Sequence, residues 1–332
     1  MNHAVTIAGG GLAGLSLGIA LRMRGVPVTL HEAGTYPRHR VCGEFISGVT
    51  DSTLETLGIA EDLAPATPLA SAVWHDTNGR VCEMQVAGRG ISRWRLDDAL
   101  QRRFTTLGGT LATHSRIAPA PGTIWAAGRP RRQGPWIGLK CHATNLTLTH
   151  DLEMHLGSNG YLGLAHIEDG KVNICGLFKK SPARGAKGTA LLTTILREGG
   201  LHDTADRLES ATLDASAFCG VAGFEMGRQP SEGFSIGDAT HMIPPFTGNG
   251  MSMAFESAGT ALPHALAYAR GERSWESAAS ACAVDLDNRF RTRMLASAAI
   301  HTLLTSPKAS RLATTLARFS LPPVQPLLHL LR

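Results

Sequence analysis

Two glycine-rich segments far apart in the chain carry the residue types that nucleotide phosphates require. In the first, GGGLAG, Gly9, Gly11 and Gly14 follow the spacing G-x-G-x-x-G between an apolar run and a helix-forming stretch. Such glycines permit a tight turn, a close approach of the backbone to a pyrophosphate, and close packing of the helix on the strand. The helix N-terminus then offers free N–H groups and a partial positive charge. The spacing predicts a dinucleotide site.

A carboxylate follows the first glycine segment at the distance typical of a ribose contact. Glu32 ends the apolar run VPVTLHEA, eighteen residues after Gly14. In dinucleotide-binding βαβ units, an acidic residue at the end of the second strand accepts hydrogen bonds from the ribose hydroxyls. We therefore expect Glu32 to bind ribose, which disfavours NADP at this site. This segment does not separate FAD from NAD.

The second segment, residues 234–258, contains an apolar run, a Gly-Asp pair, a proline-containing loop and Gly-x-Gly before another helix-forming stretch. Reduced flavin carries negative charge around N1 and O2, which free amides at a helix N-terminus would stabilise. A Gly-Asp pair followed by P-x-x-G-x-G stands more than 200 residues after G-x-G-x-x-G, a combination that is rarely accidental. Its residues are Asp238, Pro245, Gly248, Asn249, Gly250 and Met251.

These motifs resemble those of the p-hydroxybenzoate hydroxylase-like FAD superfamily, which includes aromatic hydroxylases, geranylgeranyl reductases and flavin-dependent halogenases. The resemblance covers most of residues 1–290. It implies that Asp238 binds the ribityl chain of FAD. It also implies that the loop from Pro245 to Met251 places backbone N–H groups against the pyrimidine edge of the flavin.

Two further fragments agree with this resemblance. SRWRLDDAL fits the helix start R-x-x-L-D-x-x-L of the superfamily, which implies that Arg93 lies near the FAD pyrophosphate. YPRHRVCGEFIS resembles the segment that runs past the adenosine toward the isoalloxazine. It implies that Arg38 and Arg40 contact phosphate or adenine. Cys42 would lie beside the flavin or fill a small buried site, and Glu44 is a candidate acid in the pocket.

Three residues are candidates for catalysis, and no metal site is expected. They are Cys42, Glu44 and His241, which follows the Gly-Asp pair where the superfamily often has a histidine. For His241 a structural role is preferred to acid–base catalysis. The six cysteines form no CxxC pair and no Cys/His cluster with zinc-ligand spacing.

The apolar pattern places the motifs in an α/β fold that a β-rich segment interrupts. HAVTIAG, LAGLSLGIALRMRG and VPVTLHEA read as strand, helix and strand. LASAVWHD and RVCEMQV resemble a hairpin, and strand-like runs from about residue 134 suggest an antiparallel meander. We expect a three-layer, Rossmann-like FAD domain over residues 1–65, 92–130 and 222–285, an antiparallel-sheet substrate domain over 66–91 and 131–221, and a helical C-terminal segment over 286–332.

Composition and charge are typical of a soluble cytoplasmic protein. The 332 residues are 43% hydrophobic and 18% charged, with no apolar run that could span a bilayer and no signal-peptide pattern. From Arg289 onward the chain has no carboxylate side chain. This basic tail is expected to be solvated, with contact to a membrane surface, an acyl carrier or an anionic substrate as the alternative. Nucleic acid is disfavoured because basic and aromatic residues are not interleaved.

Departures from the superfamily motifs reduce the number of reactions that the chain is expected to catalyse. Where many hydroxylases have ADGxxS, this chain has Ala126, Ala127 and Gly128, so that Ala127 replaces the Asp. The electrons are expected from NAD(P)H or from a separate flavin reductase. The loss of the Asp favours the reductase. The halogenase motif W-x-W-x-I-P does not occur. The resemblance implies a flavin monooxygenase that acts through a C4a-hydroperoxide on an apolar or aromatic small molecule. The alternatives are C=C reduction of a prenyl or polyketide-type lipid, and FAD binding without catalysis.

Overall fold

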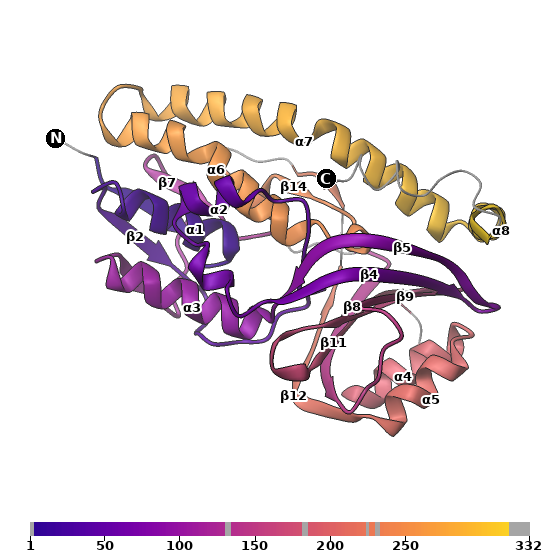
Figure 1. The fold of residues 1–332 in the computed structure, drawn as a ribbon. Helices are drawn as coiled ribbons and strands as arrows, with labels where there is room; N and C mark the ends of the chain where they lie inside the picture. The colour runs from indigo at the N-terminus through magenta and orange to yellow at the C-terminus, as the bar shows by residue number, and fades with distance from the viewer. Residues whose placement is uncertain (1–2, 130–133, 181–184, 224–225, 230–232, 319–332) are drawn as a thin grey trace.

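A computed structural model describes residues 3–129, 134–180, 185–223, 226–229 and 233–318 of the chain (Figure 1). Its N-terminal part holds a parallel four-stranded sheet in the order β6-β2-β1-β7. The expected βαβ unit is confirmed, with α1 buried along almost its whole length and in contact with α3 and α6. The elements of this part are β1 (Val5–Ala8), α1 (Leu12–Arg22), β2 (Val28–His31), β6 (Thr110–Ala112) and β7 (Thr123–Trp125).

Two helices of this part begin at side-chain caps that the sequence allows. In α2 (Asp51–Leu57), the Thr50 hydroxyl accepts a hydrogen bond from the Thr53 amide at 3.2 Å. In α3 (Arg93–Thr106), the Ser92 hydroxyl accepts from the Arg95 amide at 3.1 Å. Each cap satisfies one of the N–H groups that a helix start leaves without an intrahelical acceptor. Both helices are therefore fixed where the chain returns from the second sheet.

The second sheet has eight strands in the order β12-β8-β11-β10-β9-β4-β5-β3, and all neighbours except β4 and β9 are antiparallel. The predicted hairpin is confirmed as β4 and β5. The predicted meander is wrong in one place. A meander in chain order would pair β8 with β9, but β8 lies between β11 and β12, and β9 pairs with β4 instead. The strands are β3 (Phe45–Ile46), β4 (Thr67–Asp76), β5 (Gly79–Gly90), β8 (Trp136–Thr144), β9 (Leu152–Gly157), β10 (Gly160–His166), β11 (Val172–Lys179) and β12 (Thr212–Ala222).

The two faces of the second sheet have different neighbours. One face packs on α4 (Thr189–Glu198) and α5 (His202–Ser210) through an apolar cluster that includes Leu162, Ile174 and Leu196. The other face contributes Met154, Tyr161 and Leu177 to a cluster with Phe246. Because side chains alternate along a strand, residues two apart share a face. This second face carries the site.

The chain returns from the second sheet to the first along residues 234–242. The apolar run before the Gly-Asp pair forms only one parallel bridge, between Ser235 and Trp125. It ends because Gly237, at φ +66, starts the 3-10 turn η3 (Gly237–Ala239). A short strand, β14 (His241–Met242), then pairs with β13 (Gly227–Arg228), and η4 (Pro245–Thr247) leads into the C-terminal helices.

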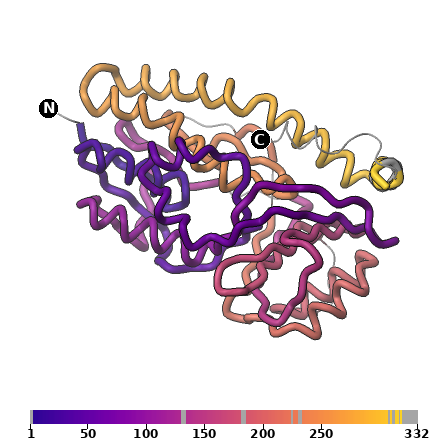
Figure 2. Tube along the Cα trace, in the orientation of Figure 1, coloured from indigo at the N-terminus to yellow at the C-terminus, as the bar shows by residue number. Residues whose placement is uncertain are grey.

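The C-terminal helices run from the first sheet to the far end of the second (Figures 1 and 2). They are α6 (Gly250–Ala269), α7 (Trp275–Thr305) and α8 (Pro307–Arg318), and α8 contacts β5. The segment expected to be helical from residue 286 is so as far as Arg318, and residues 319–332 lie outside the described part. Within the described residues, none of the helices has both the length and the apolar character that crossing a membrane requires.

Three of the basic residues in the C-terminal tail have partners inside the fold. Arg293 is buried and its guanidinium lies 2.6 Å from Glu256, while that of Arg289 lies 3.4 Å from the same carboxylate. Arg318 pairs with Asp76 at 2.6 Å. These contacts attach α7 and α8 to the rest of the protein. Contact of the tail with a membrane or acyl carrier stays a prediction, and the side chains of Lys308, Arg311 and Arg332 lie outside the described residues.

Candidate active site

Two glycines of the first turn are required by the fold itself. Gly9 has φ +110, and a Cβ there would lie 2.3 Å from the Ala126 carbonyl oxygen at the end of β7. A Cβ on Gly14 would lie 2.0 Å from the Gly9 carbonyl oxygen. Gly11 is different, because its φ is −85° and, apart from its two chain neighbours, no described residue has a heavy atom within 4 Å of a Cβ placed on it. The chain leaves space at Gly11 that it does not fill.

Gly43 and Gly250 share this property with Gly11. Neither has a positive φ that would demand glycine, and a Cβ on either would meet nothing within 4 Å. Gly43 precedes β3, and Gly250 opens α6. Backbone conformation and packing would thus accept a side chain at all three positions. Gly11, Gly43 and Gly250 thus leave unfilled space, one in each of the three segments that are expected from the sequence to contact FAD.

The helices that open at two of these glycines begin without side-chain caps. Within the described part of the chain, neither α1 nor α6 has a side-chain cap, and neither has an acidic residue in its first turn. By contrast, α2, α3 and α7 begin at capping residues. Free N–H groups at a helix start bind anions, through hydrogen bonds and the helix dipole. Both helix ends are therefore suited to negatively charged parts of a ligand.

Glu32 lies at the end of β2, as predicted, but protein groups already occupy its carboxylate. One oxygen accepts a hydrogen bond from the Gly10 amide at 2.9 Å and lies 3.5 Å from Arg40. The other accepts from the Gly34 amide and from Arg38, both at 2.9 Å. Burial raises the pKa of Glu32, but Arg40, Gly34 and Arg38 together bring it below its ordinary value. The Arg40 contact is an ion pair without a hydrogen bond, and a ribose contact for Glu32 stays a prediction.

Arg40 and Arg93 meet at one buried carboxylate. Arg93 donates to both oxygens of Asp97 at 2.7 and 2.8 Å, one helical turn along α3. Arg40 Nε donates to the same Asp97 at 2.9 Å. With Arg38 and Glu32, three guanidinium groups face two carboxylates, which leaves one net positive charge. This excess suits a phosphate, which guanidinium groups bind through charge-assisted hydrogen bonds.

Asp238 lies on η3, and its side chain is exposed. Arg93 and Arg129 both interact electrostatically with the Asp238 carboxylate. The structure thus brings Asp238 within electrostatic range of the arginine that the sequence places at the pyrophosphate. A ribityl contact for Asp238 stays a prediction.

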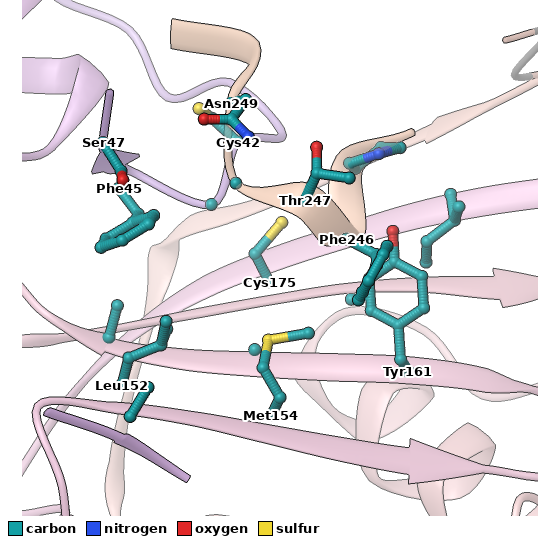
Figure 3. Close-up of a pocket in the computed structure, with 18 of the residues that line it drawn as sticks. Cys42, Phe45, Ser47, Leu152, Met154, Tyr161, Cys175, Phe246, Thr247 and Asn249 are labelled. Atoms are coloured by element: carbon teal, nitrogen blue, oxygen red, sulfur yellow. The ribbon is translucent and has the colours of Figure 1, made fainter. Parts of the chain in front are cut away.

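An apolar cavity of about 150 Å³ lies between residues 41–47, the second sheet and the loop from Pro245 to Asn249 (Figure 3). Cys42 and Asn249 lie together at one side of this cavity, which we call the inner cavity. The Asn249 side-chain oxygen is buried and has no hydrogen-bond partner among the described residues. Burial raises the pKa of the Cys42 thiol, which disfavours the nucleophilic thiolate at neutral pH. The other main lining residues are Phe45, Trp74, Leu152, Met154, Leu177 and Phe246.

Glu44 does not line the inner cavity but anchors a buried charged cluster behind Cys42. One carboxylate oxygen lies 2.6 Å from His142 Nε2, and the other lies 3.1 Å from Lys140 Nζ. The second oxygen also accepts from the Arg93 amide at 2.9 Å. Glu44 and Lys140 are both 0% exposed. The cluster thus connects the segment before β3, the start of α3 and strand β8.

The environment of Glu44 opposes its expected role as an acid. Burial raises the pKa of Glu44, but the hydrogen bond from His142 and the charge of Lys140 bring it below its ordinary value. A carboxyl group of this kind is ionised at neutral pH and has no proton to donate. The geometry therefore favours a positioning role. From the sequence His142 is expected on a solvated strand face, but it is buried. Lys140 is not predicted from the sequence, although a lysine within the apolar strand WIGLKCHAT is a usable signal.

His39 completes the cluster at its outer side. Lys140 Nζ lies 3.0 Å from His39 Nδ1, and the His39 ring stacks on Trp94 with centroids 4.5 Å apart. Because an ammonium group can only donate, His39 Nδ1 must present a lone pair. Burial, with the charges of Lys140 and His142, lowers the pKa of His39 to about 4. His39 is therefore neutral in the folded protein.

Acidification from pH 7 to pH 5 should destabilise the protein through His39. Its folded pKa lies below the value of about 6.5 of an unfolded histidine, so the unfolded state binds more protons in this window. Neutral His39 contributes fully to stability above the pKa of His39 in the unfolded chain. This contribution is lost as the pH falls toward the pKa of His39 in the folded protein. Urea unfolding at both pH values should show that His39→Asn, which keeps an acceptor for Lys140, reduces the loss by about 1 to 2 kcal/mol. Equal losses in the two proteins would contradict this assignment.

The third catalytic candidate, His241, is not among the residues that line the inner cavity. Its Nδ1 lies 3.1 Å from the Thr240 hydroxyl and its Nε2 lies 3.0 Å from Asp287 on α7. Arg228 binds the same carboxylate at 2.7 and 2.8 Å, and the His241 ring packs edge-on against Phe290. These contacts tie β13 and β14 to α7. They favour the structural role that the sequence analysis preferred for His241.

No family model matches the sequence, and no curated protein is similar to it. Solved structures with the same fold are numerous. p-Nitrophenol 4-monooxygenase PnpA from Pseudomonas putida DLL-E4 has a TM-score of 0.78 at 12% identity, over 99% of this chain and 96% of its own. Klebsiella pneumoniae HpxO, complexed with FAD and uric acid, has a TM-score of 0.76 at 15% identity, over 99% and 97%. A flavin-dependent brominase also has a TM-score of 0.76, at 17% identity, over 100% and 93%.

The fold is that of the FAD-dependent monooxygenases. The predicted Rossmann-like domain with an inserted sheet domain and a helical C-terminus is therefore confirmed. Since the brominase shares it, the fold does not fix the reaction.

Proposed function

We propose that this chain is an FAD-dependent monooxygenase that acts on an apolar or aromatic small molecule. The observation that carries the FAD assignment is the unfilled space at Gly11, Gly43 and Gly250, three glycines that neither φ nor packing explains. A ligand that passes close to the backbone at three segments explains why side chains are absent there. The N–H groups at the starts of α1 and α6, which lack side-chain caps, suit its anionic parts.

Each part of the site would hold a different part of FAD. The start of α1, with Arg93 and Arg40 on Asp97, would bind the pyrophosphate, and Asp238 would bind the ribityl hydroxyls. The amides at the start of α6 and the unpartnered oxygen of Asn249 would face the flavin ring. When bound and reduced, FAD supplies the electrons that activate O₂. The protein's own residues would bind FAD and the substrate, orient them toward each other and keep water away from them.

The inner cavity favours an apolar substrate. Its lining is dominated by aromatic and aliphatic side chains, and about 150 Å³ accommodates a single aromatic ring. The similar proteins include one named for p-nitrophenol and one complexed with uric acid, both ring compounds. We therefore propose ring or other apolar carbon as the part of the substrate that reacts. The absence of the motif W-x-W-x-I-P from the sequence opposes halogenation.

The test is oxygen transfer from isotopically labelled O₂. FAD-loaded protein is reduced anaerobically with dithionite, so that the natural electron donor does not enter, and is then mixed with labelled O₂ and p-nitrophenol, uric acid or 8-phenyloctanoate. Label in an organic product is the expected result. Saturation of geranylgeraniol without O₂ would overturn monooxygenation in favour of C=C reduction. Retained FAD with neither reaction would favour the non-catalytic alternative.

A further inference from the structure

A second cavity, of about 520 Å³, adjoins the inner cavity, and we call it the outer cavity. Tyr161 and Phe246 line both cavities. Their rings meet edge-on, with centroids 5.9 Å apart, and Trp74 packs edge-on against Phe246 at 5.5 Å. Figure 3 shows Tyr161 and Phe246 side by side at one end of the inner cavity. The two cavities therefore meet at Tyr161 and Phe246.

The lining of the outer cavity is polar and carries positive charge. It is formed by the turn from Asp76 to Asn78, the turn between β9 and β10, and the ends of α7 and α8. Lys179 lies over the Trp136 ring at 5.9 Å, and Arg318 is paired with Asp76. Among the described residues no carboxylate pairs with Lys179. Such a lining suits an anion, which the inner cavity could not hold.

Two buried polar groups of the outer cavity have unmet hydrogen-bonding capacity within the described residues. The Tyr161 side chain is 5% exposed, and its hydroxyl approaches the Phe246 backbone without completing a hydrogen bond. His301 Nδ1 is also buried without a partner. Leaving such groups unsatisfied is unfavourable, so a site of this kind is expected to receive a ligand or ordered water. Tyr161 thus offers a donor at the boundary between the cavities.

We infer that the two cavities form one substrate site with two compartments, and that the substrate is an aryl-alkyl or alkyl carboxylate. Its apolar end occupies the inner cavity, and its carboxylate occupies the outer cavity, within reach of the Tyr161 hydroxyl, His301 and Lys179. The methylene chain between them would pass Tyr161 and Phe246, and because these rings are in contact, one of them must rotate to admit the chain. This inference rests on the proposed function for the reaction at the apolar end, while the binding itself needs no turnover.

The first test compares 8-phenyloctanoate with the uncharged 8-phenyloctan-1-ol by isothermal titration calorimetry on the full chain, with and without FAD. We expect the carboxylate to bind about tenfold more tightly, as for a charged hydrogen bond. Tyr161→Phe should remove most of this preference. It should not destabilise the fold, because the hydroxyl that it deletes is buried without a hydrogen-bond partner. Tyr268→Phe, a matched change away from both cavities, should keep the preference. An equal affinity for acid and alcohol in the unmodified protein would overturn the inference.

The second test asks whether both compartments take part. Lys179→Met should weaken binding of the acid but not of the alcohol, whereas Lys180→Met, at the next position and outside the lining, should change neither. Saturation with toluene should weaken 8-phenyloctanoate binding by competition for the inner cavity. Unchanged affinity in toluene, or equal effects of the two lysine changes, would overturn the inference. Because these are binding measurements, a failure of oxygen transfer would leave them interpretable.

Discussion

Gly11→Asp should weaken FAD binding by about 100-fold or more, while leaving the protein without FAD as stable as the unmodified chain, or slightly more stable. Gly11 is the N-cap of α1, where Asp is among the preferred residues, and apart from its chain neighbours no described residue comes within 4 Å of its Cβ position. The carboxylate would satisfy the free amides at the start of α1 and would repel a pyrophosphate. Loss of two charge-assisted hydrogen bonds corresponds to a loss of affinity of about 100-fold or more.

The measurement pairs an FAD titration with urea unfolding of the FAD-free protein. Gly259→Ala is the matched control, because its Cβ would meet Thr53 at 3.4 Å, an ordinary contact, in the interior of α6. The control should keep FAD affinity. Retention of normal FAD affinity by folded Gly11→Asp would show that the space at Gly11 does not serve a pyrophosphate.

Glu44→Gln should lower the free energy of unfolding by about 3 to 5 kcal/mol, because it leaves the charge of Lys140 buried without its carboxylate. The amide can still hydrogen-bond with His142 and Lys140 but cannot neutralise the ammonium group. The double change Glu44→Gln with Lys140→Met removes both charges and should recover most of the loss. Urea unfolding of the three proteins at pH 7 gives the comparison.

The exposed ion pair of Arg80 and Glu83 provides the control for Glu44. Glu83→Gln should change stability by less than about 1 kcal/mol, since both partners are solvated. If Glu44→Gln costs no more than Glu83→Gln, or the double change is as unstable as the single one, the buried pair is not what holds this region together.

The sequence predicts those parts of the fold and site whose causes are local. A glycine turn, a cap such as Thr50 and a two-residue hairpin connection depend on neighbouring residues, so they can be read directly. The strand order of the second sheet cannot be predicted in this way, because the place of β8 between β11 and β12 depends on pairings between strands far apart in sequence. The parallel pairing of β4 with β9 is not predictable for the same reason.

The sequence indicates candidate site residues but not their pairings. It predicts phosphate or adenine contacts for Arg38 and Arg40, yet nothing local shows that both would pair with Glu32. It indicates Glu44 next to Cys42, but the partner Lys140 lies on a strand of the second sheet. His241 finds its partner Asp287 on a helix of the C-terminal segment. Such contacts arise only when distant segments pack.

The most direct test of the central claim is a titration of the purified full chain, freed of flavin, with FAD. The account predicts one FAD per chain with a Kd of about 1 μM or tighter, together with quenching of flavin fluorescence as the ring enters the site. A folded protein that shows no saturable FAD binding would contradict the assignment of both helix starts and of the space at Gly11, Gly43 and Gly250.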